Sequence, residues 1–183
     1  MKKIILLLVL LISFNTLCNS QNKKQLSERE EDSLYIDYCA RFVNNYMTYD
    51  EKISKTIRTK YPVIINSYYI KEKKCIDKII NIYLKYKGGV CDDFNKLFLS
   101  YLQREEIKEL EIYDVIVRFE QYEGRVERHA ATIIRFYENW YYFDTTWGLY
   151  WLKYIPHKIT IGAALLIKGS NELNISDICQ FFN

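Results

Sequence analysis

The chain has 183 residues, of which 49% are hydrophobic and 27% are charged. This length fits one domain and excludes a multidomain enzyme, and six Gly and two Pro exclude a collagen-like or disordered chain. The net charge of +3 falls to +1 once Lys2 and Lys3 are removed with the N-terminal segment, so the whole-chain charge predicts neither a nucleic-acid partner nor an acidic membrane surface.

The first 20 residues have the pattern of a secretory signal peptide. A basic start precedes nine consecutive apolar residues, Ile4–Ile12, which is well short of the ~20 residues that a membrane-spanning helix needs. Cys18 and Ser20 occupy the −3 and −1 positions of a cleavage after residue 20. We therefore expect export to a secreted, periplasmic or cell-surface location, with no membrane span. A lipid anchor on Cys18 is a less favoured alternative because Leu17 before it is not small, and an uncleaved anchor is a third.

Residues 21–33 are polar and charged, and we expect them to lead into a single domain over residues 34–183. Ser27 and Glu30 have the spacing of a capping box, which marks the start of a helix. Apolar residues then recur with helical spacing in three stretches. They are Leu34, Tyr38, Phe42 and Tyr46 in the first, Ile53 and Ile57 between Thr48 and Pro62 in the second, and Ile76, Ile79, Ile80, Tyr83 and Leu84 between Glu72 and Lys87 in the third.

A fourth helix is expected to begin near Cys91, directly after a sharp turn at Gly88-Gly89. Beyond this helix the apolar period changes from helical to alternating, which indicates strands. The expected strands are Glu111–Phe119, Val126–Tyr137, Trp140–Thr146, Leu149–Ile155 and Ile159–Ile167, with turns at Gln121–Arg125 and Glu138-Asn139. Helices first and antiparallel strands second predict an α+β fold.

Three residues in this order could carry out nucleophilic chemistry. Cys91 opens a helix, where free N–H groups and a partial positive charge stabilise the reactive thiolate. His129 begins one strand and Asp144 lies in the next, so a base and an orienting carboxylate are both available. Pairing Tyr137 with Trp140 would leave Asp144 four residues along the ladder from His129, so strand twist, a bulge or a longer turn is needed to bring them together.

The segments Lys87-Gly88-Gly89-Val90-Cys91-Asp92-Asp93-Phe94, His129-Ala130-Ala131 and Tyr142-Phe143-Asp144-Thr145-Thr146-Trp147 together resemble the transglutaminase-like superfamily of bacteria. The resemblance covers residues 71–147 and implies a papain-like fold. It also implies that Cys91 is the nucleophile, His129 the base and acid, and Asp144 the residue that orients His129. Thr145 stands where the family commonly has Pro, and Ala131 where it commonly has Trp.

The resemblance implies an exported thiol enzyme that hydrolyses amide bonds or transfers acyl groups through a thioester, with a protein or peptide substrate. Two alternatives remain: an inactive module that binds a peptide or a cell-surface partner, and a small surface protein stapled by disulfides through Cys91. No cofactor is expected, and no metal, because no zinc or calcium motif is present.

Several other residues carry expectations of their own. Asp92 and Asp93 would raise the pKa of the Cys91 thiol if they lay close to it. Trp140 and Trp147 are expected to pack against the catalytic residues, although Trp147 could line a groove instead. The remaining expectations are structural: Cys39, Cys75 and Cys179 as buried side chains or disulfide partners, and His157 as a structural residue.

Overall fold

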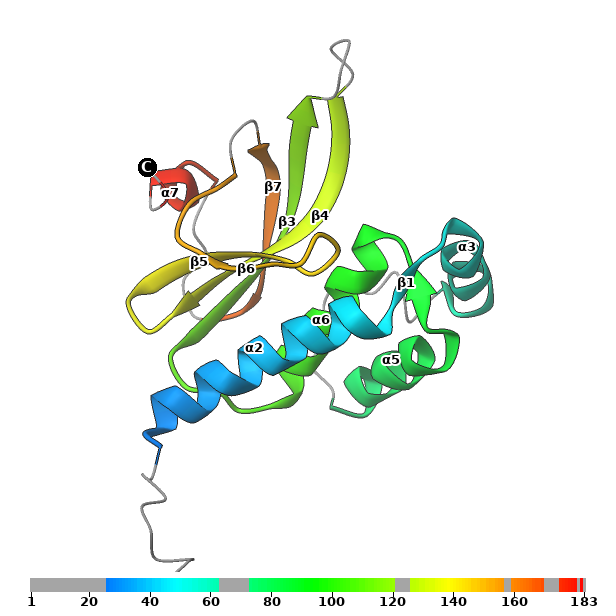
Figure 1. Ribbon diagram of the computed structural model, residues 1–183, viewed down its shortest axis with the longest axis horizontal. Helices are drawn as coiled ribbons and strands as arrows, with labels where there is room; N and C mark the ends of the chain where they lie inside the picture. The colour runs from blue at the N-terminus through cyan, green and yellow to red at the C-terminus, as the bar shows by residue number, and fades with distance from the viewer. Residues whose placement is uncertain are drawn as a thin grey trace, which may run out of the picture. The chain divides into compact units, whose positions relative to one another are not determined.

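The computed structural model describes residues 26–62, 73–120, 126–156, 159–169, 175–180 and 182. The expected signal peptide at 1–20, the expected turn at Gln121–Arg125 and His157 lie outside these residues. Among the described residues, four helices precede the main sheet (Figure 1). They are α2 (Glu28–Tyr46), α3 (Glu51–Lys60), α5 (Lys73–Tyr86) and α6 (Cys91–Arg104).

The main sheet has five antiparallel strands in the order β6-β5-β4-β3-β7, which confirms the predicted α+β fold. The strands are β3 (Leu110–Glu120), β4 (Val126–Phe136), β5 (Asn139–Asp144), β6 (Leu149–Leu152) and β7 (Ile159–Lys168). Two features were not predicted: a short parallel pair, β1 (Thr48–Tyr49) with β2 (Gly88–Gly89), and a last helix, α7 (Ile175–Gln180). Within the described residues, no helix combines the length and the apolar character needed to cross a membrane.

The turn between β4 and β5 lies one residue earlier than predicted. Phe136 pairs with Asn139, so the turn consists of Tyr137 and Glu138, and Tyr137 takes a positive φ of 55°. The predicted pairing of Tyr137 with Trp140 is therefore wrong. The corrected register moves Asp144 two residues closer to His129 along the ladder, and this shift removes half of the four-residue separation that the sequence argument left unexplained.

Helix α2 buries only part of the face that its apolar spacing predicted: Val43 is buried and Phe42 and Tyr46 pack against the core. Leu34 and Tyr38 are 56% and 65% exposed, whereas the small side chains Cys39 and Ala40 are buried. Small residues allow the helix to approach its neighbours closely, and tyrosine keeps its hydroxyl at the surface. The capping box is confirmed, because the Glu30 carboxylate accepts from the Ser27 N–H and the Glu30 N–H donates to the Ser27 hydroxyl.

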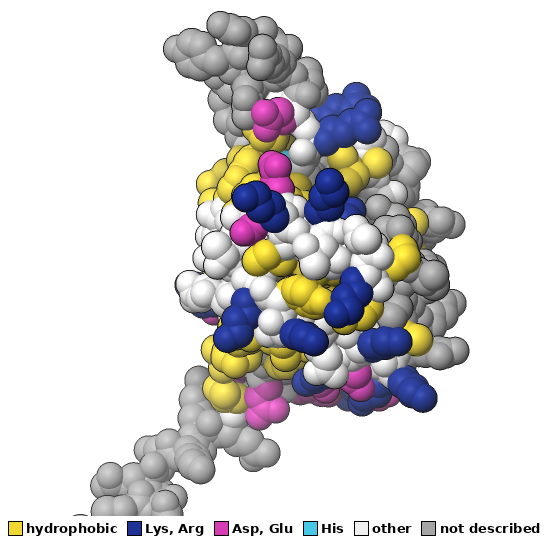
Figure 2. All heavy atoms as spheres, turned by 90° about the vertical axis from the view of Figure 1, so that its right-hand side faces the viewer, with side chains coloured by type: hydrophobic (Ala, Val, Ile, Leu, Met, Phe, Trp, Pro, Cys, Tyr) yellow, Lys and Arg dark blue, Asp and Glu magenta, His cyan; other side chains and the backbone are white. Residues whose placement is uncertain are grey.

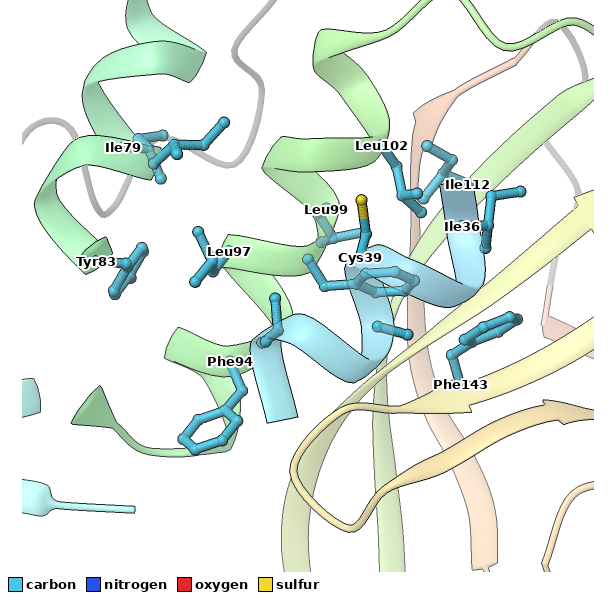
Figure 3. Close-up of a cluster of buried hydrophobic side chains, with 14 of the residues drawn as sticks. Ile36, Cys39, Ile79, Tyr83, Phe94, Leu97, Leu99, Leu102, Ile112 and Phe143 are labelled. Carbon is cyan, nitrogen blue, oxygen red and sulfur yellow. The ribbon is translucent and has the colours of Figure 1, made fainter. Parts of the chain in front are cut away.

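The main core lies between the helices and one face of the sheet. Figure 3 shows buried side chains of α2, α5 and α6 together with Ile112 of β3 and Phe143 of β5, all of which belong to one cluster. A second cluster covers the other face and includes Tyr113, Val115 and Ile178 of α7. The sheet is therefore covered on both faces, and α6 is held firmly against β4, the strand that carries His129.

Candidate active site

The backbone in front of Cys91 is fixed by glycines packed against their surroundings. In β2, a Cβ on Gly89 would overlap the side chain of Asp93, and a Cβ on Gly88 would press on the neighbouring strand β1. The positive φ that turns the chain belongs to Lys87, at 55°, not to either glycine. The glycines are therefore needed for close approach rather than for the sharp turn that the sequence predicted.

Helix α6 begins at Cys91, as predicted, and Asp93 fixes this start. The Asp93 side chain is fully buried and accepts from the Val90 N–H at 2.9 Å. The Tyr83 hydroxyl donates to the other oxygen of the same carboxylate at 2.9 Å. Burial and the charge of Asp93 raise the pKa of Tyr83 well above its ordinary value, so Tyr83 remains a hydrogen-bond donor. The Cys91 thiol is consequently placed at a helix N-terminus, where the helix dipole favours a negative charge.

The two carboxylates that follow Cys91 are balanced by two cations. Arg58 of α3 contacts Asp92 at 2.7 Å and lies 3.5 Å from Asp93, and Lys96 contacts Asp92 at 3.0 Å. The sequence raised the concern that two bare carboxylates would disfavour a thiolate at Cys91. Because Arg58 and Lys96 compensate these charges, the local balance is less negative than the sequence suggests. Arg58 lies more than thirty positions away in the chain and has no local sequence signal; Lys96 lies one helical turn after Asp92 and could have been found.

His129 and Asp144 form a short, buried hydrogen bond. The distance from His129 Nε2 to Asp144 Oδ2 is 2.7 Å, and both side chains are buried. Asp144 Oδ1 accepts from the backbone N–H groups of Thr146 and Trp147, each at 3.0 Å. The carboxylate is thereby held at Oδ1 by the turn that follows β5 and at Oδ2 by His129.

The turn after β5 is itself held by a residue that sequence reasoning missed. The side-chain amide of Asn44, on α2, donates to the carbonyl oxygens of Thr145 at 2.8 Å and Thr146 at 3.3 Å. No local pattern links Asn44 to a turn about a hundred residues later. Its effect is to fix the backbone whose N–H groups hold Asp144.

Cys91 interacts with the same imidazole ring. Cys91 lies close enough to the ring to raise the pKa of His129, and because Nε2 faces Asp144, the nitrogen left for the thiol is Nδ1. Burial alone lowers the pKa of His129, but the hydrogen bonds and charges of Asp144 and Cys91 outweigh it and raise the pKa to about 9. The structure thus brings all three predicted residues together, with the ring between a thiol and a carboxylate.

Trp147 covers one face of the His129 ring. The two rings are parallel to within 7°, with centroids 4.1 Å apart, and Phe119 meets both rings edge-on. Trp147 is 45% exposed, so it shields the imidazole on one side while remaining accessible itself. The expectation for Trp140 is wrong: it packs on Tyr113 in the second core cluster and pairs with Arg135, six residues along β4 from His129.

A second set of buried polar residues, which we call the polar network, lies one helical turn beyond Cys91. It consists of Asn95, Asp114 and Thr132. The Asn95 amide group donates to Asp114 at 2.7 Å and to the carbonyl of Ala131 at 3.0 Å, and its oxygen accepts from the Thr132 hydroxyl. The polar network therefore ties α6 to β3 and β4 directly behind the Cys91–His129 pair.

The carboxyl group of the polar network titrates unusually late for an aspartate. Burial and the charge of Asp92 raise the pKa of Asp114 to about 6, and Lys96 and Asn95 act in the opposite direction. The sequence gave no reason to select Asp114. Asn95 lies four residues after Cys91 on the same helix, and this spacing is the only signal that could have identified the network.

The described part of the chain contains no group of three or more His, Cys, Asp or Glu side chains arranged to hold a metal ion. Cys39, Cys91 and Cys179 are free thiols. A family model described as a transglutaminase-like domain matches residues 20–168. Searches of curated proteins and of solved structures found no match.

Proposed function

The chain belongs to the transglutaminase-like family, and we propose that it is an exported thiol enzyme that acts on amide bonds through Cys91, His129 and Asp144. The observation that carries this proposal is the position of the His129 ring, which lies 2.7 Å from Asp144 and close enough to Cys91 for the thiol to raise the pKa of the ring. Export is proposed from the sequence pattern of residues 1–20 alone.

In the first half of the reaction, Cys91 forms a thioester. The thiol proton moves to His129, and the sulfur attacks the carbonyl carbon of a carboxamide or peptide bond. The backbone N–H of Cys91, at the helix N-terminus, donates to the oxyanion that develops. The C–N bond then breaks, the imidazolium gives its proton to the leaving amine, and the acyl group remains on sulfur.

In the second half, a nucleophile removes the acyl group. His129 takes a proton from water or from an amine as that molecule attacks the thioester, and the C–S bond breaks to release Cys91. Water yields an acid, as in a peptidase or amidase, whereas an amine yields a new amide, as in a transglutaminase. Asp144 keeps the ring oriented and stabilises its charged form in both halves without taking up the proton.

Alkylation of individual thiols by iodoacetamide at several pH values, followed by mass mapping, tests this proposal. Cys91 should react at a pH well below ~8.5, the pKa of an ordinary thiol, and this reaction should be lost in His129→Ala. Cys75, which is also partly exposed, serves as the internal control. If Cys91 reacted no faster than Cys75 at low pH, or were found in a disulfide, the proposal would fail. Product masses from casein or from a mixture of Gln and Lys peptides then separate hydrolysis from transfer.

A further inference from the structure

Positive charge is concentrated in one region of a chain whose overall charge is small. The described residues between 50 and 87 contain nine basic and three acidic side chains, against a net charge of +3 for the whole chain. Figure 2 shows Lys and Arg side chains spread over the side of the molecule on which α3 and α5 lie in Figure 1. We use the name basic face for the exposed lysines of these two helices. They are Lys52, Lys55 and Lys60 of α3 and Lys73, Lys74, Lys78 and Lys85 of α5.

Among the described residues, the charges of these lysines are not neutralised by acidic side chains. In the described parts of the chain, none of the lysines of the basic face forms an ion pair with a carboxylate. Arg58, which lies between them on α3, is already engaged with Asp92 and Asp93. Asp50 caps α3 by accepting from its first N–H groups. The uncompensated charge of the basic face is therefore available to an external partner.

The far ends of α3 and α5 bring two of the lysines together with aromatic rings. Lys60 lies 5.8 Å from the centroid of Tyr61, and Lys85 lies 5.9 Å from that of Tyr86. The two tyrosine rings meet edge-on at 6.2 Å. Hydrogen bonds from Tyr61 and Lys60 and the charges of both lysines outweigh burial and lower the pKa of Tyr86, which shows how positive this region is.

The basic face begins beside Cys91. Tyr49, which is 57% exposed, lies close enough to Cys91 for the thiolate charge to raise its pKa, although burial has the larger effect. Asp50 follows directly, and its N–H donates to the carbonyl of Gly89, two residues before Cys91. Lys52 is in the first turn of α3. A bound substrate chain that extends from Cys91 along this helix would therefore contact Lys52, then Lys55 and finally Lys60.

We propose that the basic face binds an acidic segment of the protein substrate whose amide group Cys91 attacks. This inference rests on the proposed function, because it defines the substrate by what flanks the reacting amide. The lysine charges complement Asp and Glu side chains, and they lie on a path that leads from the thiol. A peptide chain also offers the amide that the chemistry at Cys91 requires.

Two other anionic partners fit the surface less well. A nucleic-acid surface typically uses Arg forks and aromatic side chains on which bases stack, and the one arginine here is bound to Asp92 and Asp93. A membrane surface typically adds exposed apolar side chains that insert between lipids. Among the described residues, the large apolar side chain exposed closest to the basic face is Tyr49.

Binding is tested on the full chain with Cys91→Ala, so that no turnover occurs. The probe is a fluorescein-labelled poly-glutamate peptide with one central glutamine, followed by fluorescence anisotropy, and a poly-alanine peptide with the same glutamine is the neutral comparison. Adding Lys52→Gln and Lys55→Gln should weaken binding of the acidic peptide roughly three- to tenfold. Adding Lys108→Gln and Lys153→Gln, which remove the same charge from exposed sites elsewhere, should leave binding unchanged.

Each result decides the question. Equal weakening by both double variants, or equal binding of the neutral peptide, overturns the inference. Tighter binding to vesicles with anionic lipid or to an oligonucleotide also overturns it. If Lys52→Gln/Lys55→Gln lowers the melting temperature, Lys78→Gln/Lys85→Gln on α5 takes its place in the comparison.

Turnover separates this inference from the proposed function. If the chain with Cys91 intact converts the glutamine of the acidic and the neutral peptide with equal kcat/KM, the inference fails and the proposed function stands. If the acidic peptide binds as expected but no thioester forms and no product appears, the basic face stands as a binding surface and the proposed function fails.

Discussion

Helix α6 and strand β4 are connected by two neighbouring polar clusters. The first joins Cys91 of α6 to His129 of β4, and the second, the polar network, joins Asn95 to Thr132 on the same two elements. In the polar network every partner is a protein group, and its hydrogen bonds are buried. In the Cys91–His129 cluster, by contrast, the thiol is partly exposed, and so is Trp147, which stacks on His129.

The difference indicates that the two clusters have different roles. Buried polar groups that are fully satisfied fix the relative position of the elements that they connect. The polar network therefore fixes the distance between α6 and β4. This distance in turn determines how close the Cys91 thiol lies to the His129 ring. Substitutions in the Cys91–His129 cluster should consequently change activity far more than stability. Substitutions in the polar network should change stability far more than activity.

The largest effect is expected for Cys91→Ala. Turnover should fall to background, because no Ser or Cys adjoins position 91 to replace the nucleophile. The free energy of unfolding should fall by only about 1 kcal/mol, since the side chain is partly exposed. Product release from casein or Gln/Lys peptides, with a denaturant melt on the same samples, checks both.

Cys39→Ala is the matched control for the nucleophile. Cys39 is 2% exposed within the main core, so its loss should cost about 1–2 kcal/mol of stability and leave kcat unchanged. If turnover were the same in wild type and Cys91→Ala, the comparison between the two clusters would lose its basis.

Asp144→Asn should have the next largest effect. The amide can still accept from the Thr146 and Trp147 N–H groups, so the turn should keep its structure, but the charge that stabilises the imidazolium is lost. We expect kcat to fall about a thousandfold. The pKa of His129, about 9 with Asp144 in place, should fall markedly in an NMR titration of the ring. Unfolding of this variant would instead show that Asp144 has a structural role.

The fold class, and the three residues that the proposed function uses, could be selected from the sequence because their signals are local. The change from helical to alternating apolar spacing marks the boundary between α6 and β3, and Cys91, His129 and Asp144 each lie within a short motif. The register of β4 and β5 could not be predicted, because it depends on a positive φ at Tyr137. Tyrosine rarely adopts a positive φ, so its presence in the sequence does not indicate a turn at this position.

The supporting contacts could not be predicted because they connect distant parts of the chain. Arg58 with Asp92 and Asn44 with Thr145 become neighbours only once the helices pack. Part of the buried face of α2 was misjudged for a related reason: large aromatic side chains were given more weight than Cys39 and Ala40. The charge excess between residues 50 and 87 was visible in the sequence, but the small net charge of the whole chain concealed it.

A smaller effect on activity is expected for Trp147→Ala. Removing the ring that stacks on His129 at 4.1 Å gives the imidazole more freedom and lets water reach its face. We expect kcat to fall about tenfold and Trp147→Phe to restore most of the loss, because the contribution of such a ring pair is about 1 kcal/mol. Trp140→Ala is the control: it is 8% exposed and packs on Tyr113, well along the ladder from His129, so its loss should lower stability and leave kcat nearly unchanged. Equal kcat losses in Trp147→Ala and Trp140→Ala would mean that the stack has no part in positioning His129.

The smallest effect on activity, and a distinctive effect on stability, is expected for Asp114→Asn in the polar network. The pKa of Asp114 is raised to about 6 from an ordinary value of 3.8, so the folded protein holds the proton more tightly than the unfolded chain does. The stability that this adds is fully present below pH ~3.8 and is lost as pH rises through about 6. Asparagine keeps an oxygen to accept from Asn95 and carries no charge, so the variant should be more stable than wild type at pH 7 by on the order of 1 kcal/mol. The gain should shrink toward pH 4 in urea melts, with kcat unchanged. A variant that is less stable than wild type at pH 7 would show that the fold needs Asp114 as an anion. In that case Lys96 would balance the charge of Asp114 as well as that of Asp92, and the roles of the two clusters would not be separate.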